Sequence, residues 1–520
     1  MDQGILGELK RIVQKNFLVV AKNSGKHYFN GHIILFFKFK VQNTFLDNIK
    51  YTIFIMVTLK IQNTLGNEKQ EFIPIDASHV RMYACGPTVY SYAHIGNARM
   101  AVVNDLLVKL LRQLYPKVTY VSNITDIDDK IIEAAQNTKT PLQELTRKFE
   151  NIYNEDMSVL GVNLPDIQPR ASEHINEMIE LTKKLIELDH AYEKNGHVLF
   201  HVPSFDQYGC LSRRNRDEQI IGSRVEVAPF KKDPTDFILW KPSPDPLPGW
   251  DSPWGFGRPG WHLECSAMSE KTLGLPFDIH SGGMDLTFPH HENEIAQSCS
   301  AHKKIDDPQF FAKYWFHNGF VIVDNEKMSK SIGNVKLVHE LINHYSGEVI
   351  RLALLSSHYR QPLNWTADTI NQNSAILDRL YRVLKDLNTI KVDNKDLSVP
   401  ENIMNALCDD LNTPKALAEL NLISNNISSA SPKEKKKIKG GILATGKLIG
   451  ILRENPDKWF GYGYSKSLDK KAIEGLINDR NEARRNKNFA LADSIRDKLK
   501  SEGIEIEDTK NGTIWRGVEQ

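Results

Sequence analysis

Two short segments carry residue types that suit phosphate chemistry. Near the front, His94 and Asn97 flank Gly96 where a helix would begin, so both side chains could donate hydrogen bonds to phosphate oxygens. About 230 residues later, Lys327 and Lys330 lie in the sequence Lys-Met-Ser-Lys-Ser, and two ammonium groups on a loop could stabilise charge on a transferring nucleotide. Either segment alone is a weak signal, because histidines often cap helices and lysine-rich loops are usually only solvated.

A second group of residues offers possible metal ligands. Cys85 and Cys265 could supply two thiolates, and His290 and Glu294 could add an imidazole and a carboxylate, a set that zinc accepts in tetrahedral geometry. The i, i+4 spacing places His290 and Glu294 on one face of a helix. The same spacing is common on any helix, so it also fits an ordinary histidine beside a surface glutamate. The metalloprotease pattern is absent, because Ile295 stands where its second histidine would be.

Strands that alternate with helices must position these residues. Segments 79–85 and 118–124 have the composition of β-strands, and 97–114 carries apolar residues at helical spacing. This alternation predicts an α/β fold, a doubly wound parallel sheet of the Rossmann-like, nucleotide-binding type. Ligands of such sheets bind at the carboxyl ends of the strands, where Cys85 and residues 123–129 would lie.

Further along the chain the pattern changes. A strand at 197–202 and seven prolines between 234 and 259 indicate an inserted domain, and amphipathic stretches beyond 336 predict an all-α C-terminal region. A basic helical hairpin is expected at 470–501, and with Trp515 it could offer phosphate contacts and an aromatic face. The predicted divisions are 1–55, 56–189 and 261–335 (two halves of one α/β domain), 190–260 (the insertion), 336–464 (a helical bundle) and 465–520 (a C-terminal domain).

Bulk composition limits the possibilities. The chain has 520 residues, 41% of them hydrophobic and 25% charged, which is typical of a soluble globular protein with several domains. The net charge of +1 provides no general basic field, so an RNA partner would have to be bound by local patches. Five widely spaced cysteines do not make a disulfide framework. No apolar run approaches the ~18 residues of a membrane span, and no secretory signal is evident, so we expect a cytoplasmic protein.

The order and separation of the two phosphate-type segments resemble the ATP signatures of class I aminoacyl-tRNA synthetases. Three further motifs narrow the resemblance to the cysteinyl-tRNA synthetase family: Met-Tyr-Ala-Cys-Gly-Pro-Thr-Val-Tyr at 82–90, Trp-His-Leu-Glu-Cys-Ser at 261–266 and Phe-Pro-His-His-Glu-Asn-Glu at 288–294. The resemblance runs from about Leu59 to Gly517 and includes the C-terminal motif at 511–516.

This resemblance implies a cysteine–tRNA ligase, an enzyme that forms cysteinyl-adenylate from L-cysteine and ATP with Mg²⁺ and transfers the cysteine to the 3′ end of tRNA(Cys). It implies one Zn²⁺ per chain, which would distinguish the cysteine thiolate from the hydroxyl of serine. A monomer that contacts no membrane is expected. In the family the metal ligands correspond to Cys85, Cys265, His290 and Glu294.

The resemblance also assigns roles to individual residues. It implies ATP binding by Pro87, His94, Gly96, Asn97, Lys327, Ser329, Lys330 and Ser331, with His94, Asn97, Lys327 and Lys330 catalytic. It implies binding of the cysteine substrate by Cys85, Gly86, Thr88 and Trp261. Trp261 would close over the substrate side chain, although an ordinary core aromatic residue is the alternative. Asn97 departs from the family pattern of a second histidine and cannot become cationic.

Residues 1–55 do not fit the family pattern. They hold eight Lys or Arg against three Asp or Glu, but Arg11 is the only arginine, which argues against a transit peptide. We favour the interpretation that this segment is not native and that the enzyme begins at Met56, with 56–65 as its first strand.

Two alternative functions remain. A paralogous ligase that joins cysteine to an amino sugar would lack the tail at 465–520, and a catalytically silent RNA-binding paralogue would not need intact signatures. The acidic run Asp126, Asp128 and Asp129 is expected to be structural or to orient substrate, because the family places no Mg²⁺ ligands there.

Overall fold

The computed structural model describes residues 27–29, 32–38 and 52–517, apart from 216, 219, 221–228, 330, 426, 428, 461–469, 510 and 511. Of the segment 1–55, only strands β1 (His27–Phe29), β2 (His32–Lys38) and the start of β3 (Thr52–Val57) are described, and they form an antiparallel sheet. The run 56–65, predicted as one strand, is divided: its first two residues end β3, and β4 (Lys60–Asn63) pairs with β5 (Glu68–Glu71).

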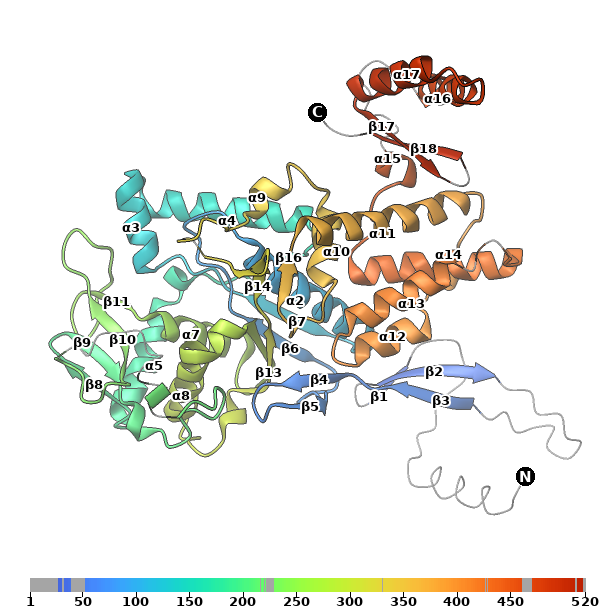
Figure 1. Cartoon of the computed structure of the whole chain (residues 1–520). Helices are drawn as coiled ribbons and strands as arrows, with labels where there is room; N and C mark the ends of the chain where they lie inside the picture. Colours follow the sequence, from blue (N-terminus) through green and yellow to red (C-terminus); the bar gives the residue numbers. More distant parts are fainter. Residues whose placement is uncertain are drawn as a thin grey trace, which may run out of the picture.

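A four-stranded parallel sheet forms the centre of the molecule, in the strand order β13-β12-β6-β7 (Figure 1). Its strands are β6 (Val80–Ala84), β7 (Val118–Ser122), β12 (Phe277–Gly283) and β13 (Ala312–Asn318). Helix α2 (Ile95–Leu114) connects β6 to β7, and α8 (Glu292–Ala301) lies between β12 and β13 in the chain. The predicted parallel α/β sheet, with strands near 79–85 and 118–124 and a helix near 97–114, is therefore confirmed.

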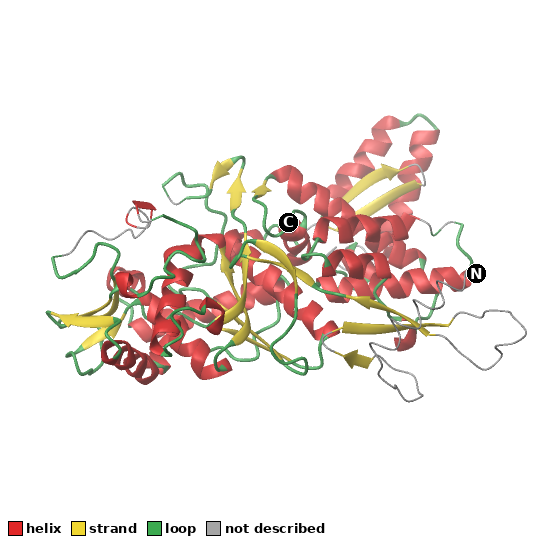
Figure 2. Ribbon diagram, turned by 90° about the horizontal axis from the view of Figure 1, so that it is seen from below, coloured by secondary structure: helices red, strands yellow, loops and turns green. Residues whose placement is uncertain are grey.

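Side-chain alternation along β6 divides the core into two layers. Met82 and Ala84 pack with the apolar face of α2, whereas Tyr83 and Cys85 pack on the other side with residues of α7 (Trp261–Leu273) and α8. Figure 2 shows helices flanking the central strands. Because successive strand residues point to opposite faces, Cys85 is directed towards the layer that contains Cys265.

The segment between the two halves of the sheet forms a sheet of its own, which packs in the same hydrophobic core as α7 and α8. Strands β8 (Ala191–Lys194), β9 (His197–Phe200), β10 (Phe237–Pro242) and β11 (Gly257–Pro259) form an antiparallel sheet in the order β11-β10-β9-β8. Helices α3 (Asp129–Thr138), α4 (Leu142–Val159) and α5 (Ile175–Glu187) precede it. A small sheet after β13 contains β14 (Val321–Val323), β15 (Glu326–Lys327) and β16 (Leu363–Trp365).

The C-terminal part is mainly helical, as predicted, and comprises α9 (Val338–Leu341), α10 (Gly347–Leu355), α11 (Ala367–Asp386), α12 (Glu401–Cys408), α13 (Thr413–Asn425), α14 (Pro432–Ile449), α15 (Pro456–Trp459), α16 (Lys470–Arg485) and α17 (Phe489–Ser501). Short 3-10 turns occupy Ala171–Glu173, Val202–Ser204, Met284–Leu286, Pro308–Phe310 and Asn394–Asp396. In the part of the chain that is described, no helix is both long and apolar enough to cross a membrane.

The end of the chain differs from the helical expectation. After the expected pair α16 and α17, the strands β17 (Ile504–Thr509) and β18 (Gly512–Gly517) form a hairpin that packs against the helices. Trp515 lies in this small core and is only 7% exposed, so it offers no open aromatic face. Arg480 is also buried and pairs with Asp508. The exposed aromatic residue of this region is instead Phe489, at the start of α17.

One buried cation joins the catalytic sheet to the helical region. Arg351 of α10 pairs with Asp105 of α2 at 2.5 Å and donates to the carbonyl oxygen of Ile449, the last residue of α14. It also donates to the carbonyls of Leu160 and Gly161, just after α4. A single guanidinium thus satisfies groups from three separate helices.

We expect Arg351→Met to destabilise the protein by about 2–4 kcal/mol, since the buried carbonyls of Leu160 and Ile449 lose this donor, whereas Asp105 keeps its pair with Lys109. Urea denaturation followed by circular dichroism measures this loss. The matched control is Arg379→Met, because Arg379 makes an exposed contact with Asn421, and its loss should cost less than about 1 kcal/mol. Equal effects of the two substitutions would contradict the role of Arg351.

Candidate metal and nucleotide site

The first phosphate-type segment begins α2. The His94 Nδ1 atom accepts the backbone N–H of Asn97, and the Asn97 Oδ1 atom accepts the backbone N–H of His94, both at 3.2 Å. The capping role considered for His94 is therefore real, and it fixes the ring: a neutral imidazole that accepts at Nδ1 carries its proton on Nε2. Capping and phosphate donation are compatible, because they use opposite edges of the ring.

The second segment lies against the first. The Ile95 N–H donates to the Lys336 carbonyl at 3.0 Å, and the Val338 N–H donates to the Ala93 carbonyl at 2.8 Å. A Cβ atom at Gly96 would lie 2.9 Å from the His94 ring and 3.5 Å from the Met328 methyl group. The 3.5 Å distance is an ordinary contact, whereas 2.9 Å is too short, so glycine at this position leaves room for the His94 ring in its capping position.

Asn334 contacts two residues of the second signature, Lys327 and Ser329. The Asn334 carboxamide accepts the Ser329 N–H at 2.9 Å and donates to the Lys327 carbonyl at 3.3 Å. The hydroxyls of Ser329 and Ser331 lie 3.1 Å apart, and Lys327 is exposed at the end of β15. Lys330 lies outside the described residues. The described part of the second signature is thus exposed beside the start of α2.

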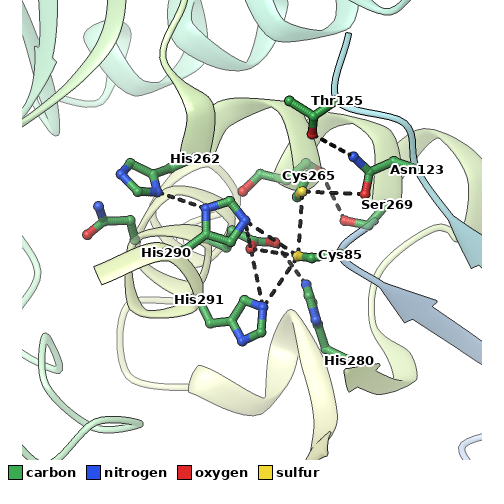
Figure 3. A network of polar contacts seen from close by, with 12 residues as sticks. Cys85, Asn123, Thr125, His262, Cys265, Ser269, His280, His290 and His291 are labelled. Carbon is green, nitrogen blue, oxygen red and sulfur yellow. Dashed lines mark hydrogen bonds and ion pairs between the residues drawn. The ribbon is translucent and has the colours of Figure 1, made fainter. Parts of the chain in front are cut away.

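The four possible metal ligands converge at the carboxyl end of β6 (Figure 3). The Cys85 Sγ atom lies 3.6 Å from the Cys265 Sγ, 3.4 Å from the His290 Nε2 and 3.6 Å from the Glu294 Oε1. The His290 Nε2 and Glu294 Oε1 atoms are 3.0 Å apart. Three segments of the chain, far apart in the sequence, therefore bring two thiols, an imidazole and a carboxylate together.

These separations fit a tetrahedral metal ion. Zinc bond lengths of about 2.0–2.3 Å place ligand atoms about 3.3–3.8 Å apart at the corners of a tetrahedron. The measured 3.0–3.6 Å lies close to this range. All four side chains are at most 4% exposed, so charged ligands here need a cation to balance them.

Burial also sets the protonation of the ligands. It lowers the pKa of His290 well below its usual value, so the ring is neutral and able to bind a metal ion. Burial, the hydrogen bond with Cys265 and the charge of Glu294 raise the pKa of the Cys85 thiol well above its usual value. The thiol must lose its proton when a metal ion binds, which couples metal binding to proton release.

Surrounding side chains orient these donors. His262 Nδ1 lies 2.9 Å from the Nδ1 of His290, and His280 Nε2 lies 2.8 Å from the Oε2 of Glu294. Such outer contacts fix the tautomer and the direction of a metal ligand. Asn123 accepts the Gly86 N–H at 2.9 Å and contacts the Cys265 thiol at 3.8 Å, so it links both cysteine-bearing segments.

Sequence reasoning missed a second possible ligand set, which shares two members with the first. Cys85, His280, His291 and Glu294 also offer ligand atoms within 4.8 Å of one another. His291 Nε2 lies 3.3 Å from the Cys85 Sγ, and His291 Nδ1 lies 2.7 Å from His317. His280 is the middle residue of β12 and lies opposite Tyr83 of β6, so only the pairing of these two strands brings it to the cluster. The first set fits zinc better because it supplies two thiols.

Trp261 and Gly86 line the surroundings of this cluster. The Trp261 ring stacks on His290, with centroids 4.1 Å apart and planes 19° apart, and the residue is 38% exposed. It is therefore not an ordinary core residue. A Cβ atom at Gly86 would lie 1.6 Å from the Asn123 carbonyl oxygen, so only glycine fits there. The neighbouring Pro87 and Thr88 run alongside Thr125, whose N–H donates to the Pro87 carbonyl at 3.1 Å.

The acidic run after β7 has structural partners. Asp126 accepts from the Ser172 backbone and hydroxyl, Asp128 caps α3, and Asp129 pairs with Lys241 and Arg258 of the inserted sheet. None of these aspartates belongs to a possible metal-binding group among the residues that the structure describes.

Comparisons with known proteins agree with this geometry. Residues 71–375 match the family described as tRNA synthetases class I (C) catalytic domain. A cysteine–tRNA ligase from Rhodospirillum rubrum is 52% identical over 464 residues, which cover 88% of this chain and 100% of that protein. One from Parvibaculum lavamentivorans is 53% identical over 460 residues, 88% of this chain and 97% of that protein. A methionyl-tRNA synthetase of Mycobacterium tuberculosis in complex with methionyl-adenylate shares the fold at 13% identity, with a TM-score of 0.51 over 76% of this chain and 96% of that one. The chain therefore belongs to the cysteine–tRNA ligase family of class I tRNA synthetases.

Proposed function

We propose that this synthetase activates L-cysteine with ATP to give cysteinyl-adenylate and transfers the cysteine to the 3′ end of tRNA(Cys). The observation that carries the proposal is the buried cluster of two thiols, an imidazole and a carboxylate at the end of β6. His94 at the start of α2 follows Cys85 of this cluster by nine positions in the sequence. A sulfur-selective pocket would therefore lie beside a phosphate-binding helix end.

In this proposal Cys85, Cys265, His290 and Glu294 hold Zn²⁺, which when bound favours a thiolate over a hydroxyl. Their separations and burial support the assignment. Cys85, Gly86 and Thr88 form the wall against which the amino acid binds. Trp261 covers the substrate side chain, an assignment supported by its stacking on His290 and its partial exposure.

The ATP molecule, bound with Mg²⁺, is proposed to lie between the two signatures. On one side are Pro87, His94, Gly96 and Asn97, and on the other are Lys327, Ser329, Lys330 and Ser331. His94 would donate through Nε2–H, and the lysines would stabilise charge on the departing pyrophosphate. The cysteine carboxylate itself attacks the α-phosphorus, and the bond to the bridging oxygen breaks as pyrophosphate leaves, so no general base is needed.

The remaining assignments concern partners and location. We propose that 465–520 binds the anticodon, that 336–464 contacts the stem of the tRNA and that 190–260 is the connective insertion between the two catalytic halves. Exposed Arg485, Lys487 and Phe489 at the turn between α16 and α17 could contact phosphates and an unstacked base. A monomer in the cytoplasm is proposed, and the five free cysteines suit a reducing compartment.

Two assays on the purified protein test this function. Cysteine-dependent exchange of pyrophosphate into ATP measures adenylate formation, and transfer of labelled cysteine to tRNA measures the second step. Exchange without transfer to tRNA would favour a ligase for another acceptor, such as an amino sugar. Loss of both activities, with tRNA still bound, would indicate an RNA-binding protein without catalysis.

Cys265→Ser is expected to lose the bound metal and to reduce cysteine activation by more than about 100-fold, because a thiolate supplies much of the binding energy. Metal content by elemental analysis and the exchange rate measure the two effects. Cys299→Ser is the control, since Cys299 is buried in α8 away from the cluster. A Cys265→Ser protein with one metal ion per chain would exclude Cys265 as a ligand.

Lys330→Ala is expected to lower the kcat of the exchange reaction by about 100-fold and to leave the KM for cysteine nearly unchanged. The charge of Lys330 acts most strongly when pyrophosphate departs. Its removal should therefore raise the free energy of the transition state and leave the binding of cysteine nearly unchanged. Lys183→Ala, which removes a surface pair with Glu180, is the control. A raised KM for cysteine at normal kcat would argue against this role.

Removal of residues 465–520 is expected to leave pyrophosphate exchange within about twofold and to reduce tRNA charging by at least tenfold. The segment has its own small hydrophobic core, so its loss should not expose the catalytic sheet. Exchange and charging rates of the truncated and full-length proteins provide the comparison. Unchanged charging, together with normal charging of a tRNA altered in its anticodon, would remove the proposed role of this domain.

A further inference from the structure

A buried carboxylate lies on the far side of the turn that carries two of the proposed metal ligands. Glu292 stands between His290 and Glu294 in the sequence and is completely buried. Its Oε1 atom accepts the N–H of Gly209 at 3.0 Å and that of Leu211 at 3.3 Å, and its Oε2 atom accepts the N–H of Ser212 at 2.7 Å. Its partners thus belong to the region of the inserted sheet.

Backbone N–H groups are the main partners of this carboxylate, and the Cys210 thiol adds a longer contact to Oε1 at 3.6 Å. Within the described ranges no lysine, arginine or histidine forms an ion pair with Glu292. Three converging N–H groups of one short segment instead form a concave anion site around it. Bonds from N–H groups to a carboxylate are stronger than those between neutral groups, so the contact joins the two segments firmly.

Two further contacts join the same segments. The Tyr208 hydroxyl donates to the Asn293 Oδ1 atom at 2.5 Å, and the Arg214 guanidinium lies 4.6 Å from the centre of the Phe288 ring. Segment 208–214 therefore contacts segment 288–293 at both of its ends, through Phe288 and through Glu292 and Asn293. We refer to segment 208–214 as the strap.

The turn that carries His290 is not a regular α-helix. Residues Thr287–His291 form a π-helical turn in which Phe288 has the extended angles φ −141° and ψ 133°, and α8 begins only at Glu292. The turn therefore lacks a continuous α-helical ladder of hydrogen bonds that would set the direction of His290. Contacts from outside must orient it: His262 and Trp261 contact the His290 ring itself, and the strap holds Phe288, Glu292 and Asn293 on either side of it in the chain.

We propose that Glu292 is a positioning residue for the metal centre: by binding the strap, its carboxylate holds the turn so that His290 and Glu294 face Cys85 and Cys265. This inference rests on the metal site proposed above. In this role Glu292 does not contact the substrate. Its contact with the strap also makes the inserted region part of the support of the cysteine pocket.

The test compares Glu292→Gln with the unaltered full-length protein. Glutamine keeps one oxygen but turns an amino group towards the N–H donors of the strap, which repels them. We expect the KM for cysteine to rise about tenfold, the KM for ATP to stay unchanged and the metal to pass to a chelator about tenfold faster. Substitution of Co²⁺ for the native metal should give a shifted visible absorption spectrum in this variant.

Two other variants keep the inference falsifiable. Tyr208→Phe removes the hydroxyl that donates to Asn293 and should change the cysteine KM and the metal release in the same direction by about twofold to threefold. Glu270→Gln is the control, because Glu270 contacts His302 at the opposite end of α8 and should change neither quantity. If Glu292→Gln does not fold, the cysteine KM and the rate of metal release are compared between Tyr208→Phe and Glu270→Gln. Equal values in these two variants would then overturn the positioning role.

The outcomes separate this inference from the proposed function. Normal metal release, an unshifted Co²⁺ spectrum and an unchanged cysteine KM in Glu292→Gln would overturn the positioning role. Equal increases in the KM values for cysteine and ATP would also overturn it, since they would indicate a general structural defect. Absence of metal from the unaltered protein, by contrast, would refute the metal site itself.

Discussion

The relation between the catalytic sheet and the helical region depends on the buried guanidinium of Arg351. Taking this charge out of water costs several kcal/mol, and the cost is offset only because Asp105 and three carbonyls are positioned around it. Asp105 belongs to α2, the same helix whose first turn holds His94 and Asn97. The contact therefore fixes the axis of α2 against the elements that follow the second signature. Gly450 permits it, because a Cβ atom there would lie 2.5 Å from the guanidinium carbon.

Local sequence patterns were sufficient for the elements that hold the first signature. Apolar spacing predicted α2, and the short apolar runs predicted β6 and β7, because each pattern reports burial of one face of a regular element. The position of Cys85 at a strand end followed from the general behaviour of parallel sheets. The family resemblance was needed to predict that Cys265, His290 and Glu294 lie beside Cys85. No local pattern connects segments of the chain that are 180 residues apart.

Other features could not be predicted because they arise only from tertiary contacts. The ring of Trp515 seemed available to a base, but the β17–β18 hairpin buries it against α16 and α17. The alternation of apolar and acidic residues in 504–508 was a signal for this hairpin that the helical expectation overlooked. His280 and Glu292 acquire their roles from partners on distant segments, and burial, which the sequence does not report, decides their chemistry.

Gly86 has a consequence for the redesign of amino-acid specificity. The backbone of Asn123 occupies the space of any side chain at this position, so the wall beside Cys85 cannot be reshaped by substitution. If Trp261 covers the substrate as proposed, its side chain is open to redesign, because it is partly exposed to solvent. Libraries that aim to load a different amino acid should therefore keep position 86 constant and include position 261 among those varied.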